Sequence, residues 1–208
     1  VRDLPPDVNG DEIFNILSAR LNARKKEMNV PDSFNPFCVA AIYSKAQRAI
    51  FHLKDIQIKL NGDVLDCEID ALRPITSFRQ LYLQGLIAGG ATVNALLDDD
   101  PFQHILKDLA THTLALLNND NAPLGFGVIN GAPIPQRFID IIDVPPGSDV
   151  IITTDGYPVI KDTLSDSEAA LQALIQTDPL FIYDSPQPRA RLKNGISFDD
   201  RSWVKFKT

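Results

Sequence analysis

The sequence predicts an α+β protein in which two antiparallel β-sheets pack together and helices flank them. Short apolar or alternating runs, typical of strands, fall in two blocks that are separated by a pair of helix-like segments. Asn61-Gly62 and Asn130-Gly131 are turn signals that tolerate positive φ, so they favour antiparallel hairpins. No linker-like stretch divides the 208 residues, and a chain of this length can bury one large core. We therefore expect a single domain covering residues 1–208.

Composition and charge narrow the class of protein. The chain is 44% hydrophobic and 23% charged, which argues against disorder. A net charge of −7 argues against nucleic acid or an anionic membrane as the partner. No apolar run approaches the ~18 residues of a membrane span. Cys38 and Cys67 lie in apolar runs, so we expect reduced core residues of a cytoplasmic protein rather than a disulfide.

The N-terminal third predicts one helix and then a meander of strands. Ile13, Leu17 and Leu21 recur every four residues, and cations follow toward the C-terminal end, where the helix dipole favours them. Beyond Pro36, four apolar or alternating runs predict an antiparallel meander. These runs are residues 37–43, 48–53, 56–60 and 64–69.

Two helices are predicted between the strand blocks. The first, residues 76–97, contains Gly85, Gly89 and Gly90, so we expect it to kink or to pack closely against a neighbour. The second has Asp100 as its N-cap and Pro101 as its first helical residue. Apolar residues along one of its faces are Phe102, Ile105, Leu106, Leu109 and Leu116.

The C-terminal part predicts further strands and one helix. Ser165 and Glu168 have the spacing of a capping box, which indicates a helix start. A loop over residues 178–194, rich in Pro and Arg, leads to the last strand. The predicted strands are residues 125–129, 137–144, 149–154 and 202–206.

Most residues that could carry chemistry have an ordinary structural explanation. His104 and His112 lie on the second long helix away from or bordering its apolar face, so we expect solvated side chains. His52 lies in a strand, where a hydrogen-bonded structural histidine is expected. A charged helix cap explains Asp98-Asp99-Asp100. The sequence has no HExxH or CxxC pattern for zinc and no G-x-S-x-G nucleophile motif.

Two acidic positions stand out because each lies at the end of a predicted strand. Asp155 ends the run 149–154 and precedes Gly156, and Asp199-Asp200 precede the last strand. A sheet holds such carboxylates in fixed positions, and their oxygens are the ligands that Mg²⁺ and Mn²⁺ prefer. Glycine after Asp155 would let a bound ion approach the backbone closely. The alternatives are a type I′ turn at Asp155-Gly156 and a solvated loop at Asp199-Asp200.

The order of these motifs resembles that of the metal-dependent type 2C protein phosphatases. "PFCVAAIYSKAQRAIFHLKDIQIKLNG" resembles the central meander of that family, with Lys54-Asp55 in place of a Gly-Asp pair. "VIITTDGYP" is similar to the family's strand ending in Ser-Asp-Gly, with Thr154 in place of Ser. "SFDDRSWVKF" is similar to a C-terminal Asp-Asn followed by a strand. With Asp-Gly-Tyr-Pro and Asp-Asp-Arg, the resemblance is closest to a phosphatase-like branch and covers nearly the whole chain.

The resemblance implies an αββα sandwich with two Mn²⁺ or Mg²⁺ ions at one edge, where a metal-activated water attacks the phosphate of a phosphorylated substrate. Asp155 and Asp199 match metal-ligand positions, and Asp200 stands where the family usually has Asn. The family's other metal-binding carboxylates belong to motifs that nothing in residues 1–27 matches. We therefore expect an N-terminal metal-binding segment to be missing, and an N-terminal fragment of the same protein to be a partner.

The main functional expectation is a metal-dependent, phosphatase-like hydrolase that acts on a phosphoester. Asp155 and Asp199 are its expected catalytic residues and metal ligands, and Asp200 is expected to help hold an ion. The cofactor would be Mn²⁺ or Mg²⁺, with two ions if the missing carboxylates are supplied.

Two alternatives belong to other classes. A phosphatase-like binding or regulatory module without catalysis is favoured by Lys54-Asp55 and by the missing carboxylates. An unrelated two-sheet hydrolase of the N-terminal-nucleophile type is disfavoured because Val1 has no nucleophilic side chain. The basic cluster of residues 189–193 is ordinarily a solvated loop, but beside a metal site it would also meet a phosphate.

Overall fold

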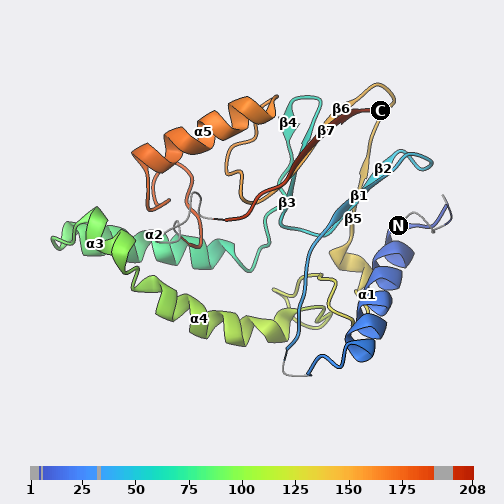
Figure 1. Ribbon diagram of the computed structural model, residues 1–208, viewed down its shortest axis with the longest axis horizontal. Coiled ribbons are helices and arrows are strands. Elements are labelled where there is room, and N and C mark those ends of the chain that lie inside the picture. Colours follow the sequence, from blue (N-terminus) through green and yellow to red (C-terminus); the bar gives the residue numbers. More distant parts are fainter. Residues whose placement is uncertain (1–4, 6, 32–33, 190–198) are drawn as a thin grey trace.

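The structure, a computed structural model, is an α+β fold with two antiparallel β-sheets flanked by helices (Figure 1). It describes residues 5, 7–31, 34–189 and 199–208. The first sheet has the strand order β1-β2-β5 and the second has the order β4-β3-β6-β7. All pairings between these strands are antiparallel, as the sequence predicts. The predicted continuous meander is wrong, because β2 and β3 lie in different sheets and do not pair. The strands are β1 (Ala41–Ser44), β2 (Ala49–His52), β3 (Ile56–Leu60), β4 (Asp63–Val64), β5 (Asp140–Asp143), β6 (Asp149–Thr154) and β7 (Trp203–Lys207).

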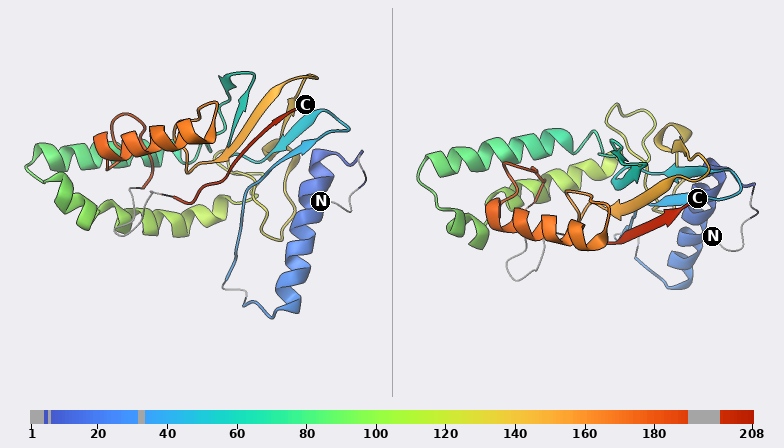
Figure 2. Two further views of the ribbon diagram at one scale, coloured as in Figure 1. Left: turned by 45° about the horizontal axis from the view of Figure 1, so that its top comes forward. Right: turned by 90° about the horizontal axis from the view of Figure 1, so that it is seen from above.

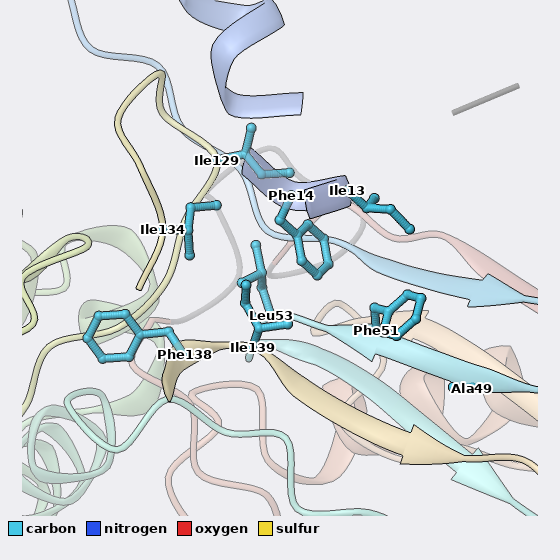
Figure 3. Close-up of a cluster of buried hydrophobic side chains, with 9 residues drawn as sticks. All are labelled: Ile13, Phe14, Ala49, Phe51, Leu53, Ile129, Ile134, Phe138 and Ile139. Carbon is cyan, nitrogen blue, oxygen red and sulfur yellow. The ribbon is translucent and has the colours of Figure 1, made fainter. Parts of the chain in front are cut away.

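The two sheets share a core because β2 is buried on both faces. Consecutive side chains of a strand point to opposite sides, so neighbouring residues of β2 join different clusters. Ile50 packs with Ile58 of β3 and Val150 of β6, which joins the two sheets. Phe51 packs in a second cluster with Phe14 of helix α1 (Gly10–Glu27). Figure 3 shows this second cluster, in which α1 covers one face of the first sheet.

The other helices gather together at one end of the strands, whereas α1 lies apart from them (Figure 2). Leu83 and Leu96 from this group are buried with Leu180 and Ile182, which belong to the chain that follows α5. Among the helices that the structure describes, none is long and apolar enough to cross a membrane. The helices of the group are α2 (Arg73–Ala88), α3 (Val93–Asp98), α4 (Phe102–Thr113) and α5 (Leu164–Thr177).

The helix predicted over residues 76–97 is two helices. α2 ends at Ala88, and Gly90 has a φ of +101°, which a residue with a side chain adopts at a cost. The predicted kink is therefore a full break. The N-cap of the next helix is Pro101 and not the predicted Asp100, although Oδ1 of Asp100 accepts the N–H of Phe102 at 2.9 Å. Pro101, predicted as the first helical residue, lies just before α4.

The strand predicted over residues 125–129 is wrong. This segment forms only isolated bridges, Cys38 with Ile129 and Leu117 with Phe126. The side chain of Asn118 satisfies the backbone that a strand partner would need: it donates to the Val128 carbonyl and accepts from the Val128 N–H, at 2.9 and 2.8 Å. The strands predicted over 64–69 and 137–144 are shortened to β4 and β5.

Local turn and cap predictions had mixed outcomes. Asn61 and Gly62 have φ values of +52° and +98°, so the predicted two-residue hairpin turn is confirmed. The capping box at Ser165 and Glu168 is wrong, because Thr163 is the N-cap of α5 and accepts the N–H of Asp166. Glu168 is instead engaged in side-chain contacts near the candidate site.

The histidines and cysteines are placed largely as expected. His104 and His112 are exposed, and Cys38 and Cys67 are free thiols. Cys67 is buried as expected, but the expected core position is wrong for Cys38, which is exposed. His52 is fully buried with its Nε2 2.7 Å from the Ile56 carbonyl. Its Nδ1 has no hydrogen-bond partner among the described residues, so the expectation of a satisfied histidine is only half met.

Candidate functional site

Two carboxylates lie at neighbouring positions where β3 and β6 meet. Ile56 is the first residue of β3 and pairs with Thr154, the last residue of β6. Asp55 directly precedes this pair and Asp155 directly follows it, so both flank the same rung of the sheet. Like charges at facing positions repel each other. The pairing of β3 with β6 therefore holds two like charges close together, and other contacts of the fold must offset this repulsion.

Strand β7 brings the second predicted acidic motif to the same edge. The Thr154 N–H donates to the Ser202 carbonyl at 3.2 Å, which continues the β6–β7 pairing beyond Trp203. A Cβ on Gly156 would lie 2.3 Å from the Asp200 carbonyl oxygen. Neither Asp155 nor Gly156 is among the described residues with positive φ, so a type I′ turn is ruled out at this position. Glycine is required here because the segment before β7 lies against it.

A polar cavity of about 250 Å³ opens beside these strand ends. Asp55 and Asp155 line it, together with Asp66 and Glu68 from the segment after β4. Arg73 of α2 pairs with Asp66 at 2.6 Å and with Glu68 at 2.8 Å, so one guanidinium partly offsets the charges of the two outer carboxylates. The remaining wall includes Gln57, Cys67, Leu72, Thr76, Pro186, Gln187 and Pro188.

The environment makes both inner carboxylates harder to ionise. The pKa of Asp55 is raised to about 6, chiefly by burial and next by the charge of Asp155. Burial also raises the pKa of Asp155, and the guanidinium of Arg189 opposes this rise. Asp55 has a φ of +77°, an uncommon backbone conformation for a residue with a side chain. Perturbed carboxylates and backbone strain together are typical of functional sites.

Among the described residues, Arg189 is a cation that contacts two carboxylates of this site. Its guanidinium nitrogen Nη2 pairs with the Asp199 carboxylate and lies 3.8 Å from Oδ2 of Asp155. The Asp199 side chain is only 10% exposed, so a solvated loop is wrong for this residue, whereas Asp200 is exposed. Of the predicted basic cluster 189–193, residues 190–193 lie outside the described part of the chain.

A second polar network fixes the chain next to Asp200. The Arg201 guanidinium donates to Glu168 at 2.9 and 3.1 Å, and the Tyr157 hydroxyl donates to the same carboxylate at 2.5 Å. These contacts tie α5 to the residues on either side of the site. Glu168, predicted as part of a helix cap, therefore has a tertiary role.

The residues at this edge suit one hard cation held by two carboxylates. One nitrogen of Arg189 meets both Asp155 and Asp199, so a single positive charge at that position reaches both groups. Mg²⁺ is commonly bound through one or two carboxylates and keeps several waters. In residues 5, 7–31, 34–189 and 199–208, no three His, Cys, Asp or Glu side chains converge as a metal-binding group.

The sequence pattern singles out Asp155, Asp199 and Asp200 as site residues and leaves Arg189 open as part of a basic cluster, but it does not place Asp55 in the site. Asp55 was noted only as part of Lys54-Asp55, although its place before a strand that follows a hairpin was a usable signal. Comparisons with protein-family models, curated proteins and solved structures found no match for this chain.

Proposed function

We propose that the chain is a metal-dependent, phosphatase-like hydrolase that acts on a phosphoester. One observation carries this proposal: at the edge of the second sheet, Asp155 and Asp199 both form ion pairs with the same guanidinium nitrogen of Arg189. A position at which two carboxylates surround one positive charge is suited to Mn²⁺ or Mg²⁺. The α+β fold with two packed sheets supports the finer assignment to a type 2C phosphatase-like αββα sandwich.

The residues of the site divide the work as follows. Asp155 and Asp199 would hold the ion, and the exposed Asp200 would contact its waters or a second ion. When bound, Mn²⁺ or Mg²⁺ supplies Lewis-acid polarisation of a phosphoryl oxygen and a more acidic water. Asp55, with a pKa of about 6, is suited to accept a proton near neutral pH. Arg189, released from the carboxylates, matches the geometry of a phosphate with its planar fork of donors.

Several further parts of the proposal concern the surroundings of the site. A second ion would need carboxylates beyond those described, and an N-terminal fragment of the same protein is the partner we propose to supply them. The net charge of −7 supports a phosphorylated small molecule or peptide rather than nucleic acid or a membrane as the partner. The free thiols Cys38 and Cys67 support a reducing, cytoplasmic location.

A phosphatase-like binding module without catalysis is the second candidate. It is favoured by the ion pairs of Arg189, which neutralise the same carboxylates that a metal would need. It is also favoured because no third ligand joins Asp155 and Asp199 among the described residues.

Hydrolysis of p-nitrophenyl phosphate with Mn²⁺ separates the two candidates. Asp155→Asn should reduce kcat/KM at least about 100-fold, because it removes a charged metal ligand. Asp149→Asn, at the exposed other end of β6, is the matched control and should leave the rate unchanged. Mn²⁺ binding measured by calorimetry should be lost in Asp155→Asn alone. If the wild-type chain neither hydrolyses the ester nor binds Mn²⁺, the proposed hydrolase function is refuted.

A further inference from the structure

Arg79 is a fully buried arginine in the middle of α2. Its Nη2 pairs with Asp100 at 3.0 Å, and the Asp100 side chain is itself only 8% exposed. Its Nη1 donates to the Leu180 carbonyl at 2.8 Å and to the Gln187 carbonyl at 3.1 Å, with a longer contact of 3.4 Å to Phe181. One guanidinium thus connects the start of α4 to two ends of a loop.

That loop belongs to a segment that we call the strap, residues 178–189. Its first residue, Asp178, is 2% exposed and accepts the N–H groups of Ile182, Tyr183 and Asp184. The N–H of Gln187 donates to the Phe181 carbonyl at 3.0 Å, so residues 181–187 form a closed loop. We call the two ends of this loop, Phe181 and Gln187, the neck of the strap.

The neck of the strap is under backbone strain. Phe181 is fully buried and has a φ of +52°, a conformation that is rare for a bulky residue. Such a residue persists only where its surroundings over-determine it. Arg79 and Asp178 provide those surroundings from two sides, and Gln80 and Gln84 of α2 add donors to the Ile182 carbonyl at 2.9 and 3.1 Å.

The strap ends at the candidate site. Pro186, Gln187 and Pro188 line the cavity that holds Asp55 and Asp155, and the next residue is Arg189. We propose that Arg79 is a positioning residue for the site: by closing the neck of the strap, it holds Arg189 against Asp155 and Asp199. The role of Arg189 toward substrate rests on the proposed function, whereas the positioning itself does not.

The contacts require arginine rather than any cation. The planar fork of a guanidinium reaches a carboxylate and several carbonyls at once, whereas an ammonium is a compact point charge on a flexible stem. Arg79→Lys therefore keeps the charge beside Asp100 but loses part of the carbonyl set. It is the milder variant, and Arg79→Met removes both kinds of contact.

The experiment measures the position of the strap and of Arg189 in the full chain without metal. Hydrogen exchange followed by mass spectrometry reports on residues 178–189, and the rate of phenylglyoxal modification reports on Arg189. Arg24, in an exposed ion pair with Glu27, is the internal reference for modification. Arg137→Met is the matched control, because Arg137 likewise binds Asp120 and three loop carbonyls but does not line the site cavity.

In Arg79→Lys, the backbone amides of the strap should exchange their hydrogens about tenfold faster than in the wild type. This is the effect expected for the loss of a hydrogen bond to a charged group. Modification of Arg189 should also accelerate relative to Arg24, and KM for p-nitrophenyl phosphate should rise. Arg79→Met should show larger changes if it folds. Arg137→Met should accelerate exchange near residues 119–122 and leave Arg189 unchanged.

Two results would overturn the proposal. The first is a folded Arg79→Lys protein with wild-type strap exchange and wild-type Arg189 modification. The second is an equal effect of Arg137→Met on Arg189, which would indicate general loosening. If the wild type hydrolyses no phosphoester while exchange and modification change as expected, the proposed function fails and the positioning role stands.

Discussion

Gly156 lies so close to the backbone carbonyl of Asp200 that a Cβ at position 156 would be 2.3 Å from that oxygen. The same added atom would be 2.8 Å from Cβ of Arg201. Backbone atoms cannot move away as a flexible side chain can. The contact therefore fixes how far the acidic segment before β7 lies from the end of β6, and hence where Asp155 lies relative to Asp199-Asp200.

Gly156→Ala should destabilise the protein by about 1–3 kcal/mol, because overpacking against backbone forces a shift of the chain. Urea unfolding measures the change. Gly85→Ala is the matched control: it lies in α2, and nothing lies within 4 Å of its added Cβ. That substitution should stabilise the helix by roughly 0.5–1 kcal/mol. A neutral Gly156→Ala would show that the two segments are not in close contact.

Asp55→Asn should stabilise the metal-free protein at neutral pH and above. The pKa of Asp55 is about 6 in the folded chain, against an ordinary value of 3.8, so the folded state binds the proton more tightly. Ionised Asp55 therefore costs stability progressively as the pH rises from about 4 to about 6, and the cost is constant above that range. We expect a gain on the order of 2 kcal/mol near pH 8 and almost none near pH 4.

Urea unfolding in EDTA at several pH values tests this prediction. Asp63→Asn, in the exposed strand β4, is the control and should change stability little at any of these pH values. A gain for Asp55→Asn that does not depend on pH would mean that the carboxylate is not the cause.

Arg189→Met should raise the affinity for Mn²⁺ by about tenfold, because it removes a unit charge that competes for Asp155 and Asp199 at the partly exposed edge of the sheet. In the same variant, orthophosphate should bind the Mn²⁺-loaded protein more weakly. Isothermal calorimetry measures both quantities, with Arg24→Met on α1 as the control. A decrease in Mn²⁺ affinity would contradict the competition between Arg189 and the ion.

Thr163→Ala should destabilise the protein by about 1 kcal/mol through loss of the cap of α5. Ser165→Ala should have almost no effect, because Ser165 lies inside the helix. Thermal unfolding of the two variants compares the cap in the structure directly with the cap that the sequence predicted. A larger loss for Ser165→Ala would reverse this assignment.

Strands that pair with chain neighbours were the most predictable part of the fold. Asn61-Gly62 specifies its own turn, so β3 was predicted with its actual bounds. The sequence could not show that residues 125–129 do not form a strand, because the side chain of Asn118 takes the place of a strand partner. Local propensity carries no information about a side chain that takes over backbone hydrogen bonds.

Part of the candidate site could be predicted from the sequence, and the rest depends on tertiary contacts. Asp155 and Asp199-Asp200 could be identified because each stands beside a strand with a clear pattern. Asp55 and Arg189 join them only through the pairing of β3 with β6 and through the path of the strap. Arg79 gives no sign in the sequence, because an arginine in an amphipathic helix is ordinarily solvated.

The link between β2 and β3 consists of residues 53–55 and passes from the first sheet to the second. Asp55 is its last residue, and its N–H is bonded to the Cys67 carbonyl at 2.7 Å. Since Ile50 and Ile58 lie in the core between the sheets, a change of volume there alters the spacing that this short link must span. We therefore expect substitutions at Ile50 or Ile58 to change the pKa of Asp55, although neither residue lines the cavity.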